Sequence, residues 1–361
     1  MCNSSFSLIS TIVHDTPLSS VPVRVAVVTD LEIERLVAST HIFVLAVHRP
    51  RPATVPTPAR RSGSILPATP GGACILGPLP PVTMKHTIEK EVISSRNHPA
   101  IKRIHNLQSR TERDSTGLFF VEGLRFVAQA VEHKATIRSI VYAPALLSTP
   151  FAQRLVRQQR YAGTRCLAVT PEVLHSLALN DDPRGIGAVV QQRWSSLEAS
   201  QPTQGLCWVA LETIQSPGNL GTIVRTCEAV GAAGLLLIGD NIDPHHPACV
   251  RASMGAMFTL DFARTTVEDF LRWKHRHGCT LVGTSPAAQA EYNAVDYESP
   301  LVLFMGWERK GLSPEQQRIC DLMVRIPMVG HSDSLNLAVA TGVMLYEVLR
   351  QRRVMEKASM L

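Results

Sequence analysis

The sequence predicts an α/β protein with two domains, the second of which contains a mainly parallel β-sheet. Strand-like and helical segments alternate along residues 84–361, which is typical of a parallel sheet covered by helices. In segments 211–239 and 300–350, a glycine-bearing turn directly follows an apolar strand and precedes a helix. Ligands bind at such turns in open α/β sheets, because backbone N–H groups and a helix N-terminus face the crevice there. We therefore expect the functional chemistry in these two segments.

Composition limits the class of protein. A chain of 361 residues with 45% hydrophobic residues is long enough for two packed domains and a tail. The net charge of +6 fits a nucleic-acid partner, but it also fits many ordinary enzymes. The eight cysteines form no C-x-x-C pair, which indicates free thiols in a reducing compartment. No run reaches the roughly 18 apolar residues of a membrane-spanning helix, so we expect a soluble, cytoplasmic protein.

Residues 1–83 differ in texture from the rest of the chain. They hold 11 of the 24 prolines, and the first lysine is Lys85. Neither a period of 2 nor one of 3.6 is visible, so we do not expect them to pack. A targeting peptide would explain the scarcity of acidic residues, but Asp30, Glu32 and Glu34 argue against it. We favour a disordered or mis-annotated extension, with Met84 as the physiological start.

Residues 84–195 predict a small α/β domain. Its first helix is expected at 99–108, with Asn97 as cap and Pro99 in the first turn. Thr170 is the predicted N-cap of its last helix. The segment 109–116 is expected to be a polar loop. The remaining predicted elements are strands at 118–123, 137–143, 165–169 and 185–192 and helices at 124–132 and 151–159.

Positive charge is concentrated at the front of this domain. The cations that we single out as candidate RNA contacts are Arg96, Lys102, Arg103, Arg110 and Arg113. The alternative interpretation is an ordinary solvated helix face. Next to a domain that acts on a large polyanion, the patch becomes a phosphate-binding surface.

A polar linker at 196–205 precedes the second domain, residues 206–361. A helix from about 219 to 230 should end at Gly231. Ser334 or Asp333 is expected to cap a long final helix over 335–353. The other predicted elements are a helix at 266–277 and strands at 207–212, 235–238, 280–283, 300–305 and 322–326.

Polar residues cluster at the two glycine-bearing turns. Asn219 and Arg225 lie six residues apart on one helix, close to Gly218 and Gly221, where the backbone is free to approach a ligand or another chain. An arginine there is, taken alone, more often a surface or interface ion-pair residue. The loop 306–311 has the form G-x-E-x-x-G, which by itself is a weak signal.

Taken in order, these pieces resemble the SpoU-type (TrmH-like) family of RNA ribose 2′-O-methyltransferases in the SPOUT class. The resemblance covers nearly all of residues 84–353, because the front domain is similar to a substrate-binding domain that precedes this catalytic domain in the family. The matching stretches are RNHPAIKRIHNL, FFVEGLRFVAQA, DDPRGIGAVV, NLGTIVRTCEAVGAAGLLL, VRASMGAMFTLDF, LVLFMGWERKGLS and IPMVGHSDSLNLAVATGVMLYEVLR.

The resemblance implies a parallel sheet with a deep trefoil knot. It also implies a homodimer whose active site lies near the subunit interface, and S-adenosylmethionine as the cofactor. The cofactor residues that it implies are Gly306, Ile326 and Leu335 through backbone groups, with Thr284 and Asn336 nearby.

The catalytic residues implied by the resemblance are Arg225, as the principal group, with Asn219, Glu308, Ser334 and Asn336. Arginine is normally protonated and is therefore an unusual general base. It would instead gather an RNA phosphate that takes the proton, or stabilise the developing alkoxide. The sequence leaves both open.

One residue departs from the family pattern. Trp307 stands where the family has a small or amide residue, and we expect it to narrow the cofactor pocket or to offer a stacking face for a base. His245 and His246 are adjacent but lack further clustered ligands, so we assign no metal.

Three functions compete at this stage. The leading one is methylation of a ribose 2′-hydroxyl in ribosomal RNA, with transfer RNA as the alternative substrate. The second is a non-catalytic RNA-binding assembly factor. A dinucleotide-dependent oxidoreductase is disfavoured, because no G-x-G-x-x-G follows a strand.

Overall fold

The computed structural model describes residues 92–178 and 185–358, which form two β-sheets. The first has four strands in the order β1-β4-β2-β3, and the second has seven in the order β7-β6-β5-β10-β8-β11-β9. The sequence therefore predicted the α/β class and the presence of two sheets correctly. The predicted extension at residues 1–83 lies outside the described residues.

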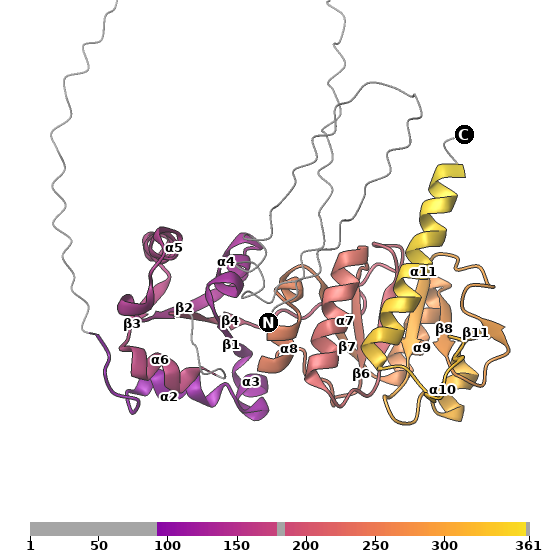
Figure 1. Ribbon diagram of the computed structural model, residues 1–361, viewed down its shortest axis with the longest axis horizontal. Helices are drawn as coiled ribbons and strands as arrows, with labels where there is room; N and C mark the ends of the chain where they lie inside the picture. The colour runs from indigo at the N-terminus through magenta and orange to yellow at the C-terminus, as the bar shows by residue number, and fades with distance from the viewer. Residues whose placement is uncertain (1–91, 179–184, 359–361) are drawn as a thin grey trace, which may run out of the picture. The chain divides into compact units, whose positions relative to one another are not determined.

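The first sheet is mixed. Strand β4 pairs antiparallel with β1 and β2, whereas β2 and β3 are parallel. Helices α4 and α5 cover one face and α2 and α6 cover the other (Figure 1). The elements are α2 (Pro99–Asn106), α3 (Arg110–Thr116), β1 (Leu118–Glu122), α4 (Leu124–Glu132), β2 (Ile137–Tyr142), η1 (Pro144–Leu146), α5 (Pro150–Tyr161), β3 (Arg165–Ala168), α6 (Pro171–Leu177) and β4 (Ile186–Gln191).

Local capping explains where these helices begin. Thr170 Oγ1 accepts a hydrogen bond from Val173 N, which confirms the predicted start of α6. The predicted cap of α2 was wrong by one residue, because His98 Nδ1 and not Asn97 accepts from Ala100 N, over 3.2 Å. The segment expected to be a polar loop is helix α3, which ends at Gly117 in the left-handed conformation.

Every pair of neighbouring strands in the second sheet is parallel. Helices α7, α8 and α11 pack on one face, and α9 and α10 pack on the other. The elements are β5 (Trp208–Leu211), α7 (Pro217–Val230), β6 (Gly234–Ile238), α8 (Pro247–Ala252), η2 (Ala256–Phe258), β7 (Asp261–Thr265), α9 (Val267–His277), β8 (Thr280–Thr284), β9 (Ala290–Glu291), β10 (Leu301–Met305), α10 (Pro314–Ile319), β11 (Leu322–Arg325) and α11 (Leu337–Ala358).

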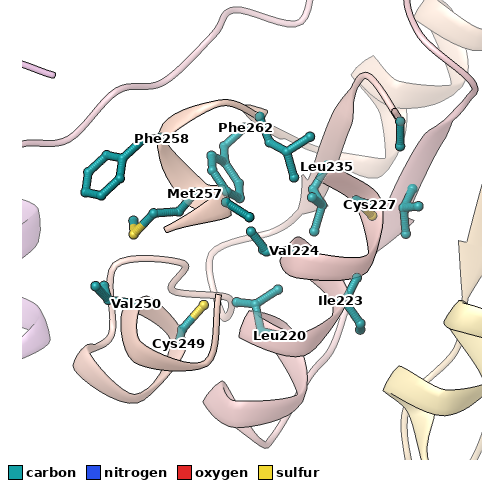
Figure 2. Close-up of a cluster of buried hydrophobic side chains, with 14 of the residues drawn as sticks. Leu220, Ile223, Val224, Cys227, Leu235, Cys249, Val250, Met257, Phe258 and Phe262 are labelled. Atoms are coloured by element: carbon teal, nitrogen blue, oxygen red, sulfur yellow. The ribbon is translucent and has the colours of Figure 1, made fainter. Parts of the chain in front are cut away.

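Helix α7 is held in place by its buried face. Figure 2 shows Leu220 and Val224 of this helix among side chains from α8 and β7, including Cys249 and Phe262. A Cβ atom on Gly221 would lie 2.4 Å from the carbonyl oxygen of Cys249. Gly221 therefore permits close packing of α7 on α8, and not the approach of a ligand that the sequence suggested.

The two sheets are joined by a buried ion pair and an aromatic cluster. Arg113 of α3 is 1% exposed, and its Nη2 lies 2.5 Å from Asp243 Oδ2. Its Nη1 donates to two carbonyl oxygens at the end of α2. Nearby, the ring of His245 packs against Phe119 and Trp194, at centroid distances of 4.7 and 5.3 Å.

The strand order reverses near the centre of the second sheet. From β5 the chain builds outward through β6 and β7, and it then returns to the other side, where β10 fills the position between β5 and β8. The sheet thus reverses its strand order between β5 and β10. Loops after these two strands lie side by side at the carboxyl edge, which is the usual ligand position in this class of sheet.

Candidate active site

A cavity of about 360 Å³ lies at the carboxyl ends of β8, β10 and β11. That volume is within the range of small-molecule sites. Thr284, Gly306, Ile326 and Leu335, which the sequence suggested for the cofactor, all line it. The fifth suggested residue, Asn336, is not among the lining residues.

The loop after β10 forms one wall of the cavity. Trp307 N donates to Gly311 O over 3.1 Å, and Gly311 N donates to Trp307 O over 2.8 Å, so the loop closes on itself. A Cβ atom on Gly306 would lie 2.3 Å from the carbonyl carbon of Gly311 and 2.4 Å from Leu312 N. No side chain fits at position 306, so glycine there allows the two ends of the loop to pack against each other.

Glu308 connects this loop to the turn before α7. Its carboxylate accepts hydrogen bonds from Gln215 N at 3.2 Å, Ser216 N at 3.5 Å and Asn219 Nδ2 at 3.3 Å. An ionised carboxylate only accepts hydrogen bonds, and three donors already surround this one. Glu308 is consequently placed to position the turn at 215–219.

Asn336 connects the same turn to the last helix. Its Oδ1 accepts from Ala338 N at 2.9 Å, and its Nδ2 donates to Asn219 Oδ1 at 3.1 Å. The cap of α11 is therefore Asn336, and the prediction of Ser334 or Asp333 as cap was wrong. The helix begins at Leu337 because the Asn336 carbonyl group satisfies its first free N–H groups.

Arg225 and Ser334 lie apart from this hydrogen-bond chain. Ser334 is exposed and lines the cavity. Arg225 is exposed on α7, does not line the cavity, and forms no hydrogen bond or ion pair within residues 92–178 and 185–358. Six residues along a helix amount to about 9 Å of rise, so Arg225 stands well away from Asn219.

Trp307 also lines the cavity. That it narrows the cofactor pocket stays a prediction. The ammonium group of Lys310 lies 5.5 Å from the centre of its ring. The indole N–H of Trp307 is buried and has no hydrogen-bond partner in the described structure. The other three tryptophans, Trp194, Trp208 and Trp273, each donate this N–H to an oxygen.

Comparison with known proteins agrees with this geometry. The SpoU rRNA Methylase family matches residues 207–346, and an MRM3-like substrate binding domain matches residues 98–188. The 23S rRNA (uridine(2479)-2′-O)-methyltransferase of Streptomyces viridochromogenes is 33% identical over 267 residues, covering 72% of this chain and 92% of that protein.

The chain belongs to the SpoU family.

Solved structures of SpoU proteins share the fold. An AdoMet-bound rRNA methyltransferase from Sinorhizobium meliloti aligns with a TM-score of 0.67 at 38% identity, over 72% of this chain and 97% of that one. The SpoU methyltransferase AviRb from Streptomyces viridochromogenes, in complex with AdoMet, aligns with a TM-score of 0.65 at 32% identity, over 70% and 98% of the two chains.

The five front-domain cations of this SpoU protein are not equivalent. Arg96, Lys102 and Arg103 are exposed. Arg110 donates to the carbonyl oxygens of Asp240 and Asn241, in the loop after β6, and pairs with Asp114. Arg113 is buried in its ion pair and offers no surface to RNA, so its prediction as an RNA contact was wrong.

The adjacent histidines have structural roles. His246 Nδ1 accepts from Ala248 N over 3.1 Å and caps α8. His245 is 2% exposed within the aromatic cluster, and burial lowers the pKa of its imidazole to about 4. The ring is consequently neutral at physiological pH.

Sequence reasoning missed the part that Gln215 and Ser216 play. Their backbone N–H groups receive the Glu308 carboxylate, and Ser216 Oγ accepts from Asn219 N over 3.3 Å to cap α7. The available signal was the Ser-Pro pair at 216–217, which is typical of a helix start.

Proposed function

We propose that this SpoU protein transfers a methyl group from S-adenosylmethionine to a ribose 2′-hydroxyl of ribosomal RNA. The observation that carries the proposal is the cavity at the carboxyl ends of β8, β10 and β11, lined by Thr284, Gly306, Ile326 and Leu335. The names of the relatives support it, since the Streptomyces protein is a 23S rRNA 2′-O-methyltransferase and the Sinorhizobium structure contains AdoMet.

The cavity suits this cofactor in shape and chemistry. Apolar side chains such as Met305, Leu312 and Ile326 line it next to backbone groups of the 306–311 loop, as an adenosine with a flexible amino-acid arm requires. Gly306 lets the loop close tightly, because a side chain there would collide with the backbone of Gly311 and Leu312. When bound, S-adenosylmethionine supplies an electrophilic methyl group on sulfur.

The protein must make a poor nucleophile react. A ribose hydroxyl has a pKa far above neutral, so the site has to orient it and to handle its proton. Arg225 carries a permanent positive charge and has no partner in the described chain, which leaves its five N–H donors free for a phosphate or for the developing alkoxide. Asn219, Glu308 and Asn336 keep the turn before α7 in place, and Ser334 offers a hydroxyl at the cavity.

A second copy of the chain brings Arg225 to the reacting hydroxyl in this proposal. Four of the exposed large hydrophobic side chains, Val339, Tyr346, Val354 and Met355, lie on α11, and α11 packs against α7. Exposed apolar residues concentrated on one helix mark an interaction surface. We infer a homodimer that forms through the exposed apolar residues of α11. We also infer a trefoil knot, formed where the chain after β10 returns to the cavity.

Ribosomal RNA is favoured over transfer RNA because the front domain matches a substrate-binding domain and the relatives are named for 23S rRNA. Exposed Arg96, Lys102 and Arg103 are the proposed contacts on the α2 side. No helix within the described part of the chain is long and apolar enough to span a membrane. We infer that the protein works in the cytoplasm, where ribosomal RNA is made and modified.

Two measurements test this function. Calorimetric titration should show binding of S-adenosylmethionine and none of NAD. Mapping of 2′-O-methyl groups in total RNA, with and without this protein, should reveal a ribosomal position that loses its methyl group. Cofactor binding without any change in RNA methylation would favour the non-catalytic assembly factor, and a change confined to transfer RNA would select that substrate.

A further inference from the structure

Helix α5 carries an unusual surface on the face of the first sheet opposite α2 and α6 (Figure 1). Residues 133–171, which include it, hold six lysines and arginines and no aspartate or glutamate. A stretch of that length with a single sign of charge produces a positive potential that nothing within it cancels.

The outward face of α5 combines arginine with aromatic side chains. Ala152, Leu155 and Val156 are buried against the sheet. The side chains turned to solvent come from the other half of the helix. On the 100° period of a helix, five of the exposed side chains fall within one 120° sector: Phe151, Arg154, Arg157, Gln158 and Tyr161; Gln153 and Arg160 are exposed outside it.

The aromatic rings of this sector are largely exposed, and its two arginines have no ion-pair partner within the described residues. Tyr161 is 87% exposed and Phe151 is 49% exposed, which is high for aromatic rings. Arg154 and Arg157 form no ion pair with any described residue. By contrast, Arg160 points to the sheet, where its Nη2 donates to the Tyr142 hydroxyl over 2.6 Å and fixes the helix.

Positive charge continues in the neighbouring strands, but not on the α5 face. Arg165 alternates with Cys166, which packs beneath α5, so its side chain lies on the α2 and α6 side, and Arg138 donates to Gln191 Oε1. Both arginines are exposed, as is Lys134 just before β2. The nearest acidic residue in the sequence, Glu132, lies at the end of α4. The α2 side is less uniform, because Arg110 there is already paired with Asp114.

We propose that this α5 surface, formed by Arg154, Arg157 and Tyr161, binds a single-stranded segment of the RNA substrate. The two arginines contact successive phosphates, and an unpaired base stacks on the Tyr161 ring. Arginine supplies forked donors that match phosphate oxygens, and an aromatic side chain stacks on any base, which is how proteins hold unpaired RNA. This inference rests on the proposed RNA substrate and assigns a surface to it.

The test uses the full chain with two probes, a fluorescein-labelled 20-nucleotide oligouridylate and a 20-base-pair RNA duplex. Arg154→Ala/Arg157→Ala should weaken oligouridylate binding by tenfold or more. Its log–log salt slope should fall by about 1.4, which is roughly 0.7 for each lost phosphate contact. Tyr161→Ala should weaken binding about tenfold, whereas Tyr161→Phe, which keeps the ring, should bind as the intact protein does. Duplex affinity should be unaffected by either Tyr161 change.

The control for net charge is Arg272→Ala/Arg276→Ala, which removes two exposed arginines of α9 on the second sheet, one of them paired with Glu268 and Asp269. It should leave oligouridylate affinity within twofold, and S-adenosylmethionine affinity should be unchanged in every variant. Equal binding by the intact protein and the Arg154/Arg157 variant overturns this surface alone. An equal loss in the α9 control overturns it too, because the effect would then be one of net charge. An intact protein with no RNA affinity overturns the proposed substrate as well.

Discussion

Asn336 and Asn219 share a side-chain hydrogen bond of 3.1 Å that links the start of α11 to the start of α7. Because Asn336 Oδ1 is already bound to N–H groups of α11, only its Nδ2 is available to Asn219. Asn219 must then present its oxygen to Asn336 and its nitrogen to Glu308. The two amides and the carboxylate are therefore oriented by the cap of a helix.

This orientation predicts the effect of Asn336→Asp. Aspartate caps a helix as well as asparagine does, so the free energy of unfolding should change little. The new carboxylate cannot donate to Asn219 Oδ1, and Asn219 should turn away from Glu308. We expect single-turnover methylation to slow by about 10- to 100-fold, the scale of a misplaced active-site group.

The comparison variant is Asn336→Ala, which loses the cap as well as the link. It should be less stable by about 1 kcal/mol in urea denaturation, in addition to being slow. Methylation by the aspartate variant at the wild-type rate would show that the Asn336–Asn219 bond has no part in positioning the site.

If Arg225 acts on a phosphate or on the developing alkoxide as proposed, Arg225→Ala should slow single-turnover methylation by roughly 10² or more. Affinity for S-adenosylmethionine should hardly change, since Arg225 does not line the cavity. Arg225→Lys should rescue poorly, because lysine keeps the charge but lacks the planar fork.

Sedimentation decides whether a slow Arg225 variant has lost its catalytic group or the proposed dimer. A variant that remains dimeric, binds S-adenosylmethionine and methylates normally would make Arg225 a surface or interface residue only.

Lys102→Ala/Arg103→Ala tests the α2 side of the front domain. Both side chains are exposed, and their loss should weaken RNA binding and flatten its salt dependence, without altering cofactor affinity. Filter binding of a large-subunit rRNA transcript at several salt concentrations measures both quantities. Unchanged RNA affinity would return these residues to the status of a solvated helix face.

The buried His245 makes stability depend on pH. Its pKa is lowered to about 4 in the folded chain, from a usual value of 6.5. Between those pH values the unfolded chain binds a proton that the folded chain does not, so the free energy of unfolding falls as the pH is lowered. Between these two pH values, the free energy of unfolding should fall by about 1.4 kcal/mol for each unit by which the pH is lowered. Above this window, His245 should not make the free energy of unfolding depend on pH.

His245→Phe should remove that slope, because phenylalanine fits the aromatic cluster and does not titrate. Urea denaturation from pH 4 to pH 7 compares the two proteins, and the other titrating groups cancel in the difference. Two parallel curves would mean that His245 takes up its proton equally in both states.

Elements with strong local signals were predictable from the sequence. Helix α4 and most strands were expected within a residue or two of their observed bounds, because apolar periodicity and caps such as Thr170 are local properties. Helix α3 has no such apolar period. It carries the buried Arg113, whose partner Asp243 is 130 residues away in the chain. Because local patterns do not reveal a partner at that distance, the sequence did not show that Arg113 is buried.

Only part of the candidate site was predictable from the sequence. Residues that line the cavity, such as Gly306, follow from the family pattern. The pairing of Glu308 with the turn at 215–219 depends on β10 lying beside β5, and no local pattern carries that information. The helical period predicts on which side of α7 Arg225 lies relative to Asn219. The exposure of Arg225 depends on how α7 packs in the folded protein, which the period does not reveal.

The position of β10 between β5 and β8 also determines when this protein can mature on the ribosome. A nascent chain that has emerged as far as β8 holds the paired strands β5, β6 and β7 and the single strand β8, whose partners β10 and β11 are still missing. The two parts join only when β10 has emerged, and the cavity needs Leu335 and the start of α11 as well. The protein can therefore bind its cofactor only near the end of translation. A truncated product that stops before α11 would contain all seven strands but would expose the apolar sheet face that α11 covers, and would be a substrate for chaperones and proteases.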